Sequence, residues 1–460
     1  MRELWQREPD GSLSWFLHAG QMAALHCLAR IILVLAGTQG GKTSFGPVWL
    51  LAEMQKCGPG DYIAASVSYP LFRLKMLPEL RRLFCDEYKW NYSKSDRVIT
   101  SPDGAYRIIL LSAATDGGLE SATAKAAWLD EWGQDTVGIE HFEAVKRRVA
   151  LNSGRILITT TPYNLGWLKV NVYDQWKGGN PRYAVVNFRS IDNPAFPIAE
   201  YEAARAEMPD WRFRMFYNGE FTKPAGLIYS DYEDSYATHQ PVVMYTNEMP
   251  GPGRYVSGGN LVRPFRIPDH WLRYVGADFG DVNTAMLWIA EDPVTHHLYA
   301  YREMHGVTQT YAEHARDSLA YGEPVAVWRG GAASEDEIRG TWQEAGVAMA
   351  LPLIQDVEPG IDRGIGLFKT RRLFVFDTLV MFRSQLGTYS RELDDAGEPT
   401  RKISSKAKYH VLDAYRYIAG EFELDQPRQE QEQLPPADTR KKGSVAARLG
   451  AMAPPESEDY

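Results

Sequence analysis

Residues 31–44 read IILVLAGTQGGKTS, an apolar run that passes directly into a glycine-rich loop. This order is typical of a site that binds phosphate groups, because the N–H groups of the loop and the positive end of the following helix point at the anion. The pattern GxxxxGK[ST] is met except at its first position, where Ala36 stands and Gly37 follows. The stretch therefore predicts a strand, a phosphate-binding loop and a helix that starts near Phe45.

Five residues of this loop carry the predicted contacts with a nucleotide. We expect the glycine backbone to surround the phosphates of ATP, the lysine to contact the β- and γ-phosphates, and the threonine hydroxyl to bind Mg²⁺. The five residues are Gly37, Gly40, Gly41, Lys42 and Thr43. The alternative is a glycine-rich turn with an exposed lysine, but the order of strand, glycines, Lys-Thr pair and helix favours the nucleotide site.

Length and composition limit the class of protein. A chain of 460 residues with 44% hydrophobic residues can bury a large interior and is expected to form about two or three domains. Its three cysteines have spacings that suit neither a disulfide framework nor a zinc site, which predicts a reduced intracellular protein. No secretory signal or membrane-spanning run is present, so we expect a soluble protein. The net charge of −9 still allows a local basic groove for nucleic acid.

The pattern of apolar runs predicts an α/β protein. Short β-rich runs alternate with helix-length segments up to residue 160, which indicates a parallel sheet with helices on both faces. We assign residues 1–165 to an ATPase core, 166–225 to a small connecting or lid subdomain and 226–270 to a linker. Residues 271–425 form a second α/β domain, and 426–460, rich in Gln, Glu, Pro and Ala, a disordered tail.

A second motif of the first domain is AAWLDEW, residues 126–132. A buried type of strand ends there in two adjacent acids, as a nucleotide-hydrolysing site requires. We expect Asp130 to complete the Mg²⁺ shell and Glu131 to orient the attacking water. A strand that ends in solvated acids is the alternative, and the phosphate-binding loop in the same domain makes it less favoured.

Three further features belong to this site. TTTPYN follows the strand RILI, and Thr159, Thr160, Thr161 and Pro162 are candidates for sensing the γ-phosphate and coupling its loss to movement; a plain strand-end turn is the alternative. Gln21 is a candidate for reading the adenine base, although a surface glutamine that opens a helix fits nearly as well. An arginine that stabilises the transition state stays unassigned; Arg147, Arg148 and Arg155 lie between the acids and TTTP.

A cluster of acids is predicted in the second domain. GADFGD places Asp278 on a strand, and HVLDAYRYI places Asp413 on a helix with an apolar side. Carboxylates from strands and a late helix hold pairs of Mg²⁺ or Mn²⁺ ions in nucleases. Glu335 is the preferred third acid, with Glu303 and Asp281 in reserve. A structural role is the alternative for each, such as an ion pair between Asp413 and Arg416.

Basic residues crowd the sequence before Asp413. They could contact the phosphate backbone of DNA without reading its sequence, whereas ordinary solvated helix faces explain each group taken alone. The residues are Lys369, Arg371, Arg372, Arg401, Lys402, Lys406 and Lys408.

The ordered set of glycine loop, AAWLDE, TTTP, GADFG and HVLDAYRY resembles the large terminase subunit of tailed bacteriophages over roughly residues 16–423. The resemblance implies an ATPase that drives double-stranded DNA through a portal into a procapsid, joined to a ribonuclease H-like nuclease that cuts concatemeric DNA. It also implies a ring of subunits, a small terminase partner and action in the host cytoplasm. The resemblance assigns ATP and Mg²⁺ binding to Lys42 and Thr43 and hydrolysis to Asp130 and Glu131. It assigns coupling to residues 159–162, and the nuclease metals to Asp278 and Asp413.

Two departures from the family pattern affect these expectations. Many members carry an arginine inside the phosphate loop, where this chain has Thr38 and Gln39. The acid expected after strand PVAVW is replaced by Trp328 and Arg329, so the assignment of Glu335 is a hypothesis. Two alternatives follow: a DNA translocase or helicase-like ATPase whose second domain binds DNA without cutting it, and a non-enzymatic DNA-binding scaffold. The presence of Lys42 and Glu131 disfavours the scaffold.

Overall fold

The apolar run before the glycine loop forms a strand, β3 (Ile31–Ala36), in which every residue is buried. Because successive side chains of a strand point to opposite faces, Ile32 and Val34 join an apolar cluster on one face of the sheet, while Leu33 and Leu35 join a second cluster on the other face. A strand that is buried on both faces is typical of a parallel sheet covered by helices.

The computed structural model describes residues 4–114, 123–134, 136–240, 254–280, 283–307, 309–394 and 398–424. The predicted tail at residues 426–460 and Asp281 lie outside these ranges. The strands of the described ranges include two large sheets.

The first sheet has eight strands, and β3 lies between β10 and β9. The six strands from β10 to β7 are parallel, whereas β6 and β5 continue the sheet in antiparallel pairs. In spatial order the strands are β10 (Tyr183–Phe188), β3, β9 (Arg155–Thr160), β8 (Ala126–Asp130), β4 (Gly60–Ser66), β7 (Tyr106–Ser112), β6 (Val98–Thr100) and β5 (Asn91–Ser93).

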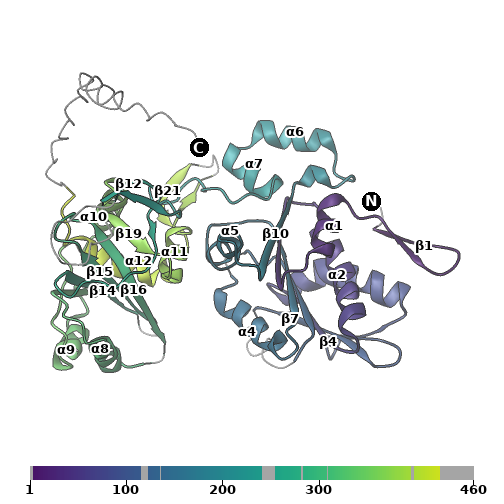
Figure 1. The fold of residues 1–460 in the computed structure, drawn as a ribbon, viewed down its shortest axis with the longest axis horizontal. Helices are drawn as coiled ribbons and strands as arrows, with labels where there is room; N and C mark the ends of the chain where they lie inside the picture. Colours follow the sequence, from purple (N-terminus) through teal and green to yellow (C-terminus); the bar gives the residue numbers. More distant parts are fainter. Residues whose placement is uncertain are drawn as a thin grey trace, which may run out of the picture. The chain divides into compact units, whose positions relative to one another are not determined.

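Helices cover both faces of this sheet (Figure 1). The cluster on one face includes residues of α1 (Ala19–His26), α2 (Lys42–Cys57), α3 (Tyr69–Leu80) and η1 (Arg81–Glu87). The cluster on the other face includes residues of α4 (Ile139–Ala150) and η3 (Lys169–Tyr173). The predicted parallel α/β sheet with helices on both faces is therefore confirmed. No helix in the described part of the chain has both the length and the apolar character needed to cross a membrane.

Residues 166–225 supply a strand of the first sheet, which sequence analysis did not predict. β10 pairs in parallel with β3 along its whole length. The rest of the segment is mainly helical. Its other elements are α5 (Asp174–Lys177), η4 (Ser190–Asp192), α6 (Ile198–Glu207) and α7 (Asp210–Tyr217).

A separate hairpin of β1 (Trp5–Arg7) and β2 (Leu13–Trp15) lies near the start of the chain.

The second sheet has seven strands. β15 pairs antiparallel with both β14 and β16, and β14 pairs in parallel with β17. Counted from β14 in chain order, the central strands lie in the order 3-2-1-4-5, which is the ribonuclease H-like arrangement predicted for this half. In spatial order the strands are β13 (Leu261–Val262), β19 (Leu373–Phe376), β16 (Leu298–Val307), β15 (Asn283–Glu291), β14 (Leu272–Phe279), β17 (Val327–Gly330) and β18 (Met349–Ala350).

The two faces of this sheet carry different helices. Val275 and Ala277 pack with α8 (Tyr311–Ala320) and α9 (Asp336–Glu344) on one face. α12 (His410–Ala419) packs across β14 and β15 and also contacts α10 (Val357–Lys369) and α11 (Val380–Leu386). Outside the sheet lie β11 (Ala237–Gln240), β12 (Arg254–Gly258), β20 (Arg391–Leu393), β21 (Pro399–Ile403) and η5 (Lys406–Lys408).

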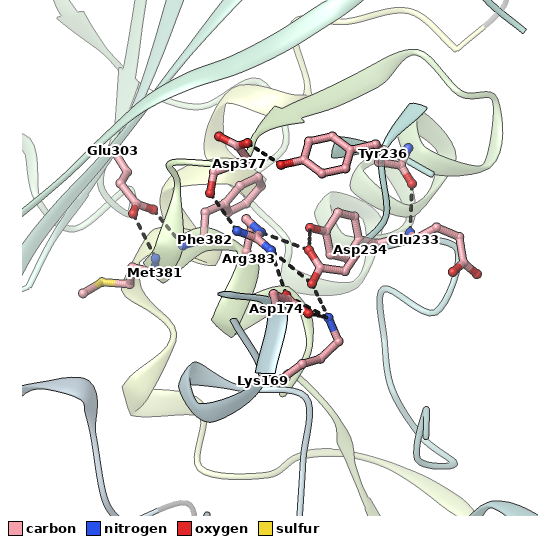
Figure 2. Close-up of polar contacts among 12 residues, drawn as sticks. Lys169, Asp174, Glu233, Asp234, Tyr236, Glu303, Asp377, Met381, Phe382 and Arg383 are labelled. Carbon is pink, nitrogen blue, oxygen red and sulfur yellow. Dashed lines mark hydrogen bonds and ion pairs between the residues drawn. The ribbon is translucent and has the colours of Figure 1, made fainter. Parts of the chain in front are cut away.

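Arg383 of α11 is the centre of a cluster of ion pairs (Figure 2). Its guanidinium lies 3.0 Å from Asp234 and 3.1 Å from Asp174, and Lys169 contacts both of these carboxylates. The two cations hold the pKa of Asp234 well below its usual range against the effect of burial. Each charge of this largely buried cluster therefore has an opposite charge beside it, as buried ionic groups require.

Gly276 on β14 allows α12 to approach the sheet. A Cβ atom at this position would lie 2.0 Å from the carbonyl oxygen of Ala414, a backbone atom that cannot move independently of the helix. The same close approach brings Asp278 of β14 and the first turn of α12 together. The packing of this helix on this strand therefore depends on the absence of a side chain at one position.

We expect Gly276→Ala to lower the free energy of unfolding by about 1–3 kcal/mol, because the added methyl group forces α12 away from the sheet. Gly340→Ala is a matched control, since Gly340 lies in α9 with nothing within 4 Å of the position of the added methyl group. That control should be neutral or stabilising by up to about 1 kcal/mol through helix propensity. Urea denaturation of both variants measures the difference, and equal stabilities would contradict the packing argument.

Candidate functional site

The predicted nucleotide residues meet at one edge of the first sheet. Parallel strands place their carboxyl ends at the same edge, and the glycine loop, the acid pair and TTTP follow β3, β8 and β9. β9 lies between the other two strands, and Thr159 is opposite both Val34 of β3 and Asp130 of β8. The sheet order thus places TTTP between the loop and the acids.

Lys42 is the first residue of α2 and lies over the glycine loop. Its ammonium donates hydrogen bonds to the carbonyl oxygens of Ala36 at 3.1 Å and Gly37 at 2.9 Å, and to the hydroxyl of Thr161 at 2.9 Å. The side chain is buried, and burial lowers its pKa. Gly41, which precedes the helix, has φ +88°, a left-handed conformation that favours glycine. The lysine therefore contacts both the phosphate loop and the proposed coupling motif.

Asp130 is held by two hydroxyl groups. Thr43 donates to Oδ2 at 2.9 Å and Thr159 donates to Oδ1 at 2.6 Å. A hydroxyl and a carboxylate oxygen this close together are the donor types that Mg²⁺ takes in proteins, and Mg²⁺ keeps its remaining positions for water and phosphate oxygens. The residues present therefore fit the predicted magnesium site formed by Thr43 and Asp130.

Burial, followed by the neighbouring charge of Glu131, raises the pKa of Asp130 to about 6, although the hydrogen bonds from Thr159 and Thr43 and the charge of Lys42 act in the opposite direction. The side chain has no exposed surface. A carboxylate in such a place is costly to ionise unless a cation comes to it. A positive ion bound beside Asp130 would therefore stabilise the charged form of this carboxylate.

Glu131 lies beside Asp130 in a left-handed conformation with φ +59°. Its N–H donates to the carbonyl oxygen of Thr159 at 2.7 Å, and its Oε2 accepts a hydrogen bond from the hydroxyl of Tyr163 at 2.8 Å. Lys75 Nζ lies 3.6 Å from Oε1. Burial and the charge of Glu131 raise the pKa of Tyr163, so this phenol stays a donor. Sequence analysis did not identify Tyr163 or Lys75 as partners of Glu131.

Gln21 of α1 and His18, the residue that precedes this helix, bind the glycine loop. The amide of Gln21 donates to the carbonyl oxygen of Gly41 at 3.0 Å, and its oxygen accepts from the N–H of His18 at 3.2 Å. His18 Nδ1 accepts from the N–H of Gly20, so in the neutral ring Nε2 donates to the carbonyl oxygen of Gly40 at 3.1 Å. The structure thus places Gln21 at the loop; its contact with adenine stays a prediction.

The loop is also held from residues far along the chain. Thr38 donates its N–H to the carbonyl oxygen of Phe216 at 2.7 Å, and its own carbonyl oxygen accepts from Ser190 at 2.6 Å. Asn193 donates to the carbonyl oxygen of Gln39 at 2.7 Å. No sequence motif marks these supports. Arg155, at the start of β9, pairs with Glu53 at the edge of the sheet opposite the predicted nucleotide residues, which does not favour Arg155 as the arginine that stabilises the transition state.

The second predicted site brings Asp278 and Asp413 close to His410. His410 Nδ1 lies 2.8 Å from Asp278 Oδ2, and the charge of Asp278 is among the causes that raise the pKa of Asp413, after burial. The hydrogen bond to Asp278 raises the pKa of His410. Arg416 donates to Asp413 Oδ1 at 3.1 Å from two of its nitrogens. Each acid therefore already has a basic neighbour. Sequence analysis did not identify His410 as a partner of Asp278.

The candidates for a third acid have other partners. Glu335 precedes α9 and accepts a hydrogen bond from the N–H of Ala332. Glu303 accepts from the N–H groups of Met381 at 2.9 Å and Phe382 at 2.7 Å, so it caps the start of α11 (Figure 2). Arg329, at the end of β17, pairs with Glu421 at 2.7 Å. Asp281 lies outside the described residues.

The donors around Asp278 fit a metal site only in part. Two carboxylates from a strand and a helix are suitable ligands for Mg²⁺ or Mn²⁺. Among the residues that the structure describes, however, no group of three His, Cys, Asp or Glu side chains is arranged to hold a metal ion. Asp278 and Asp413 thus form a pair, and the joining of Glu335 to that pair stays a prediction.

Some of the basic residues predicted to contact DNA have structural partners. Arg372 is buried and bonds to the carbonyl oxygen of His296, and Arg371 bonds to that of Gly258. Arg401, Lys402, Lys406 and Lys408 are exposed and lie in β21 and η5, directly before α12. Lys406 is near enough to Asp413 for its charge to lower the pKa of that acid. The exposed basic segment 401–408 therefore lies beside the acid pair.

Several solved structures of phage large terminases resemble this chain. The large terminase of a thermophilic bacteriophage is 16% identical over 88% of this chain and 99% of that chain, with a TM-score of 0.42. The large terminase of bacteriophage HK97 is 14% identical over 89% of this chain and 95% of that chain, with a TM-score of 0.47. The nuclease domain of the P22 large terminase is 24% identical over 36% of this chain and 91% of that chain, with a TM-score of 0.29.

No family model matches the sequence, and no curated protein matches it either.

The raised pKa of Asp130 predicts how the stability of the protein depends on pH. A carboxyl group whose pKa is near 6 when folded and near 4 when unfolded binds its proton more tightly in the folded state, so its contribution to stability is present at low pH and is lost as the pH rises through about 6. Asp130→Asn removes this titration. Without divalent ions, we expect the variant to gain stability relative to the wild type between pH 4 and pH 7, by about 2 kcal/mol.

Urea unfolding of both proteins at several pH values, in the presence of a chelator, measures this difference. A difference in stability that stays constant across the range would show that Asp130 titrates normally.

Proposed function

We propose that this chain is an ATP-hydrolysing motor that moves double-stranded DNA into a viral procapsid and carries a metal-dependent endonuclease domain, as in the large terminase subunit. The ATPase part is supported by the hydrogen bonds at one edge of the first sheet. Asp130 accepts from Thr43 and Thr159, Glu131 donates its N–H to Thr159, and Lys42 donates to Thr161 of the same motif. These are the groups that bind a nucleoside triphosphate and hydrolyse it.

In this proposal each residue has a distinct task. The N–H groups of the glycine loop and Lys42 bind the phosphates, and Thr43 and Asp130 hold Mg²⁺, which when bound neutralises charge on the phosphates. Glu131 orients a water molecule and accepts its proton. Lys42 donates a hydrogen bond to Thr161. When the γ-phosphate leaves, Lys42 loses a partner, and its hydrogen bond passes this change directly to the TTTP segment. This contact supports the proposed coupling role of Thr159, Thr160, Thr161 and Pro162.

Glu131→Ala should lower the rate of ATP hydrolysis by about 100-fold or more, because the group that accepts the proton is lost. Binding of ATP should persist, since the loop and Lys42 are unchanged. Glu140→Ala, which removes an exposed acid of the same domain, is the control and should hydrolyse ATP at the wild-type rate. A phosphate-release assay and nucleotide titration measure both properties; normal turnover in Glu131→Ala would refute the assigned role.

The proposed partners follow from the resemblance of the motif set and from the exposed basic segment 401–408. Exposed lysine and arginine side chains beside an acid pair are suitable for the phosphate backbone of double-stranded DNA. A ring of subunits on a portal, a procapsid, a small terminase subunit and a place in the host cytoplasm belong to the same proposal. They are supported by the motif set alone.

The endonuclease part of the proposal depends on Asp278 and Asp413, which are close together at the contact of β14 with α12. Asp278→Ala and Asp413→Ala should each abolish Mn²⁺-dependent cleavage of DNA and leave ATP hydrolysis within about twofold of the wild type, because the two sites use different residues. Asp269→Ala, at an exposed position of the same half, is the control. Cleavage of plasmid DNA on gels is the measurement, and unchanged cleavage in the variants would exclude the pair.

A second function is favoured by the basic neighbours of the acid pair. His410 and Arg416 each contact one of the two carboxylates, and the described residues hold no group of three such side chains arranged to bind a metal ion. A domain of this kind could bind DNA through residues 401–408 without cutting it. The alternative is therefore a DNA translocase or helicase-like ATPase, and absence of cleavage by the wild-type chain in Mg²⁺ and Mn²⁺, with DNA-stimulated ATP hydrolysis, would favour it.

A further inference from the structure

Trp128 lies on β8, next to the residues of the proposed ATPase site, and donates a hydrogen bond to one of them. Its indole N–H donates to the hydroxyl oxygen of Thr159 at 2.9 Å, and the whole side chain is buried. α2 leaves room for the ring only because residue 46 is glycine: a Cβ atom there would lie 1.9 Å from a ring carbon of Trp128. The ring is therefore fixed between β8 and the helix that follows the phosphate loop.

The hydroxyl of Thr159 has one hydrogen and two acceptors within reach. Asp130 Oδ1 is 2.6 Å away, and the carbonyl oxygen of Leu129 is 3.4 Å away. The indole can only donate, so it occupies a lone pair of the Thr159 oxygen and leaves the hydroxyl hydrogen for an acceptor. With Trp128 on one side and Asp130 at the shorter distance on the other, the hydroxyl points at the carboxylate.

Thr159 in turn fixes the carboxylate of Asp130. One oxygen, Oδ1, is occupied by Thr159, and the other, Oδ2, faces Thr43 at 2.9 Å. The orientation of Asp130 therefore depends on a chain of three donors and acceptors that starts at the indole N–H. Such a chain of buried hydrogen bonds holds its members more rigidly than separate bonds do.

We propose that Trp128 is a positioning residue of the ATP-hydrolysing site, whose indole N–H orients the hydroxyl of Thr159 and through it the carboxylate of Asp130. This inference rests on the ATPase activity proposed above. Trp128 contacts neither nucleotide nor water in this mechanism; it acts only through Thr159. Its role is specific to the N–H group and does not follow from the size of the ring.

Trp49 provides a matched comparison. It belongs to the same apolar cluster as Trp128 and is also fully buried, but its indole N–H finds no hydrogen-bond acceptor among the described residues. Trp49→Phe and Trp128→Phe therefore remove the same atoms from the same core. Only the second change removes a hydrogen bond.

The test compares the steady-state hydrolysis of ATP by the full chain and its variants. We expect Trp128→Phe to lower kcat by about threefold to tenfold, the effect of one neutral hydrogen bond, while KM for ATP stays within about twofold. Trp49→Phe should stay within about twofold of the wild type in both constants. Equal kcat values for the two variants would overturn the inference and leave the proposed ATPase function intact.

A double variant shows whether Trp128 acts through Thr159. Thr159→Val removes the hydroxyl, so Trp128→Phe should cause no further loss of kcat in that background. Losses that multiply in the double variant would assign Trp128 a separate, structural effect. If Trp128→Phe does not fold, benzothienylalanine at position 128 keeps the size of the ring and replaces the N–H by sulfur.

A crystal structure of Trp128→Phe gives a readout that does not require activity. We expect the Thr159 side chain to change rotamer, so that the distance between its oxygen and Asp130 Oδ1 increases from 2.6 Å. An unchanged Thr159 rotamer, still within hydrogen-bond distance of Asp130, would overturn the inference. A wild-type chain that does not hydrolyse ATP would refute the proposed function, and this structure would still decide whether the indole orients Thr159.

Discussion

The hydrogen bonds that Asp130 accepts from Thr43 and Thr159 tie together three segments that are distant in the sequence. They form because the parallel register of β9 with β3 and β8 places Thr159 directly opposite Val34 and Asp130. A shift of that register by one residue would turn Thr159 to the other face of the sheet. The pairing of three buried strands thus determines whether the residues of the proposed nucleotide site meet.

The proposed nucleotide site contains buried charged groups and a strained backbone, both of which lower the stability of the folded state. Asp130 and Lys42 are buried, and burial opposes the charge on both. Glu131 has a left-handed backbone that a side chain with a Cβ atom rarely adopts. Strain and buried charge of this kind persist where the surroundings fix them, here the apolar clusters on both faces of the sheet. A cation and a triphosphate would relieve the electrostatic part.

Sequence patterns were sufficient for the strand, the loop and the acids, because each is marked by a local run of residues such as the one that ends in Lys42. They did not predict His18, Ser190 or Tyr163, because these residues contact the loop or Glu131 only after segments up to 152 residues apart have packed together. The pairing of Arg416 with Asp413 could be foreseen as an alternative, since residues three apart on a helix are neighbours. The pairing of His410 with Asp278 could not, because it depends on where α12 crosses β14.

The two acid sites differ in what surrounds their carboxylates. Asp130 is held by neutral hydroxyl groups, which fix its oxygens without cancelling its charge, so the charge remains available to a divalent ion. Asp278 and Asp413 instead face His410 and Arg416, and the hydrogen bond of the one and the positive charge of the other compete with a metal ion for the carboxylate oxygens. A metal ion at the second site must therefore displace or outweigh these neighbours, for example when DNA phosphates draw the arginine away. The first site requires no such exchange, and this difference explains why the residues support nucleotide hydrolysis more directly than DNA cleavage.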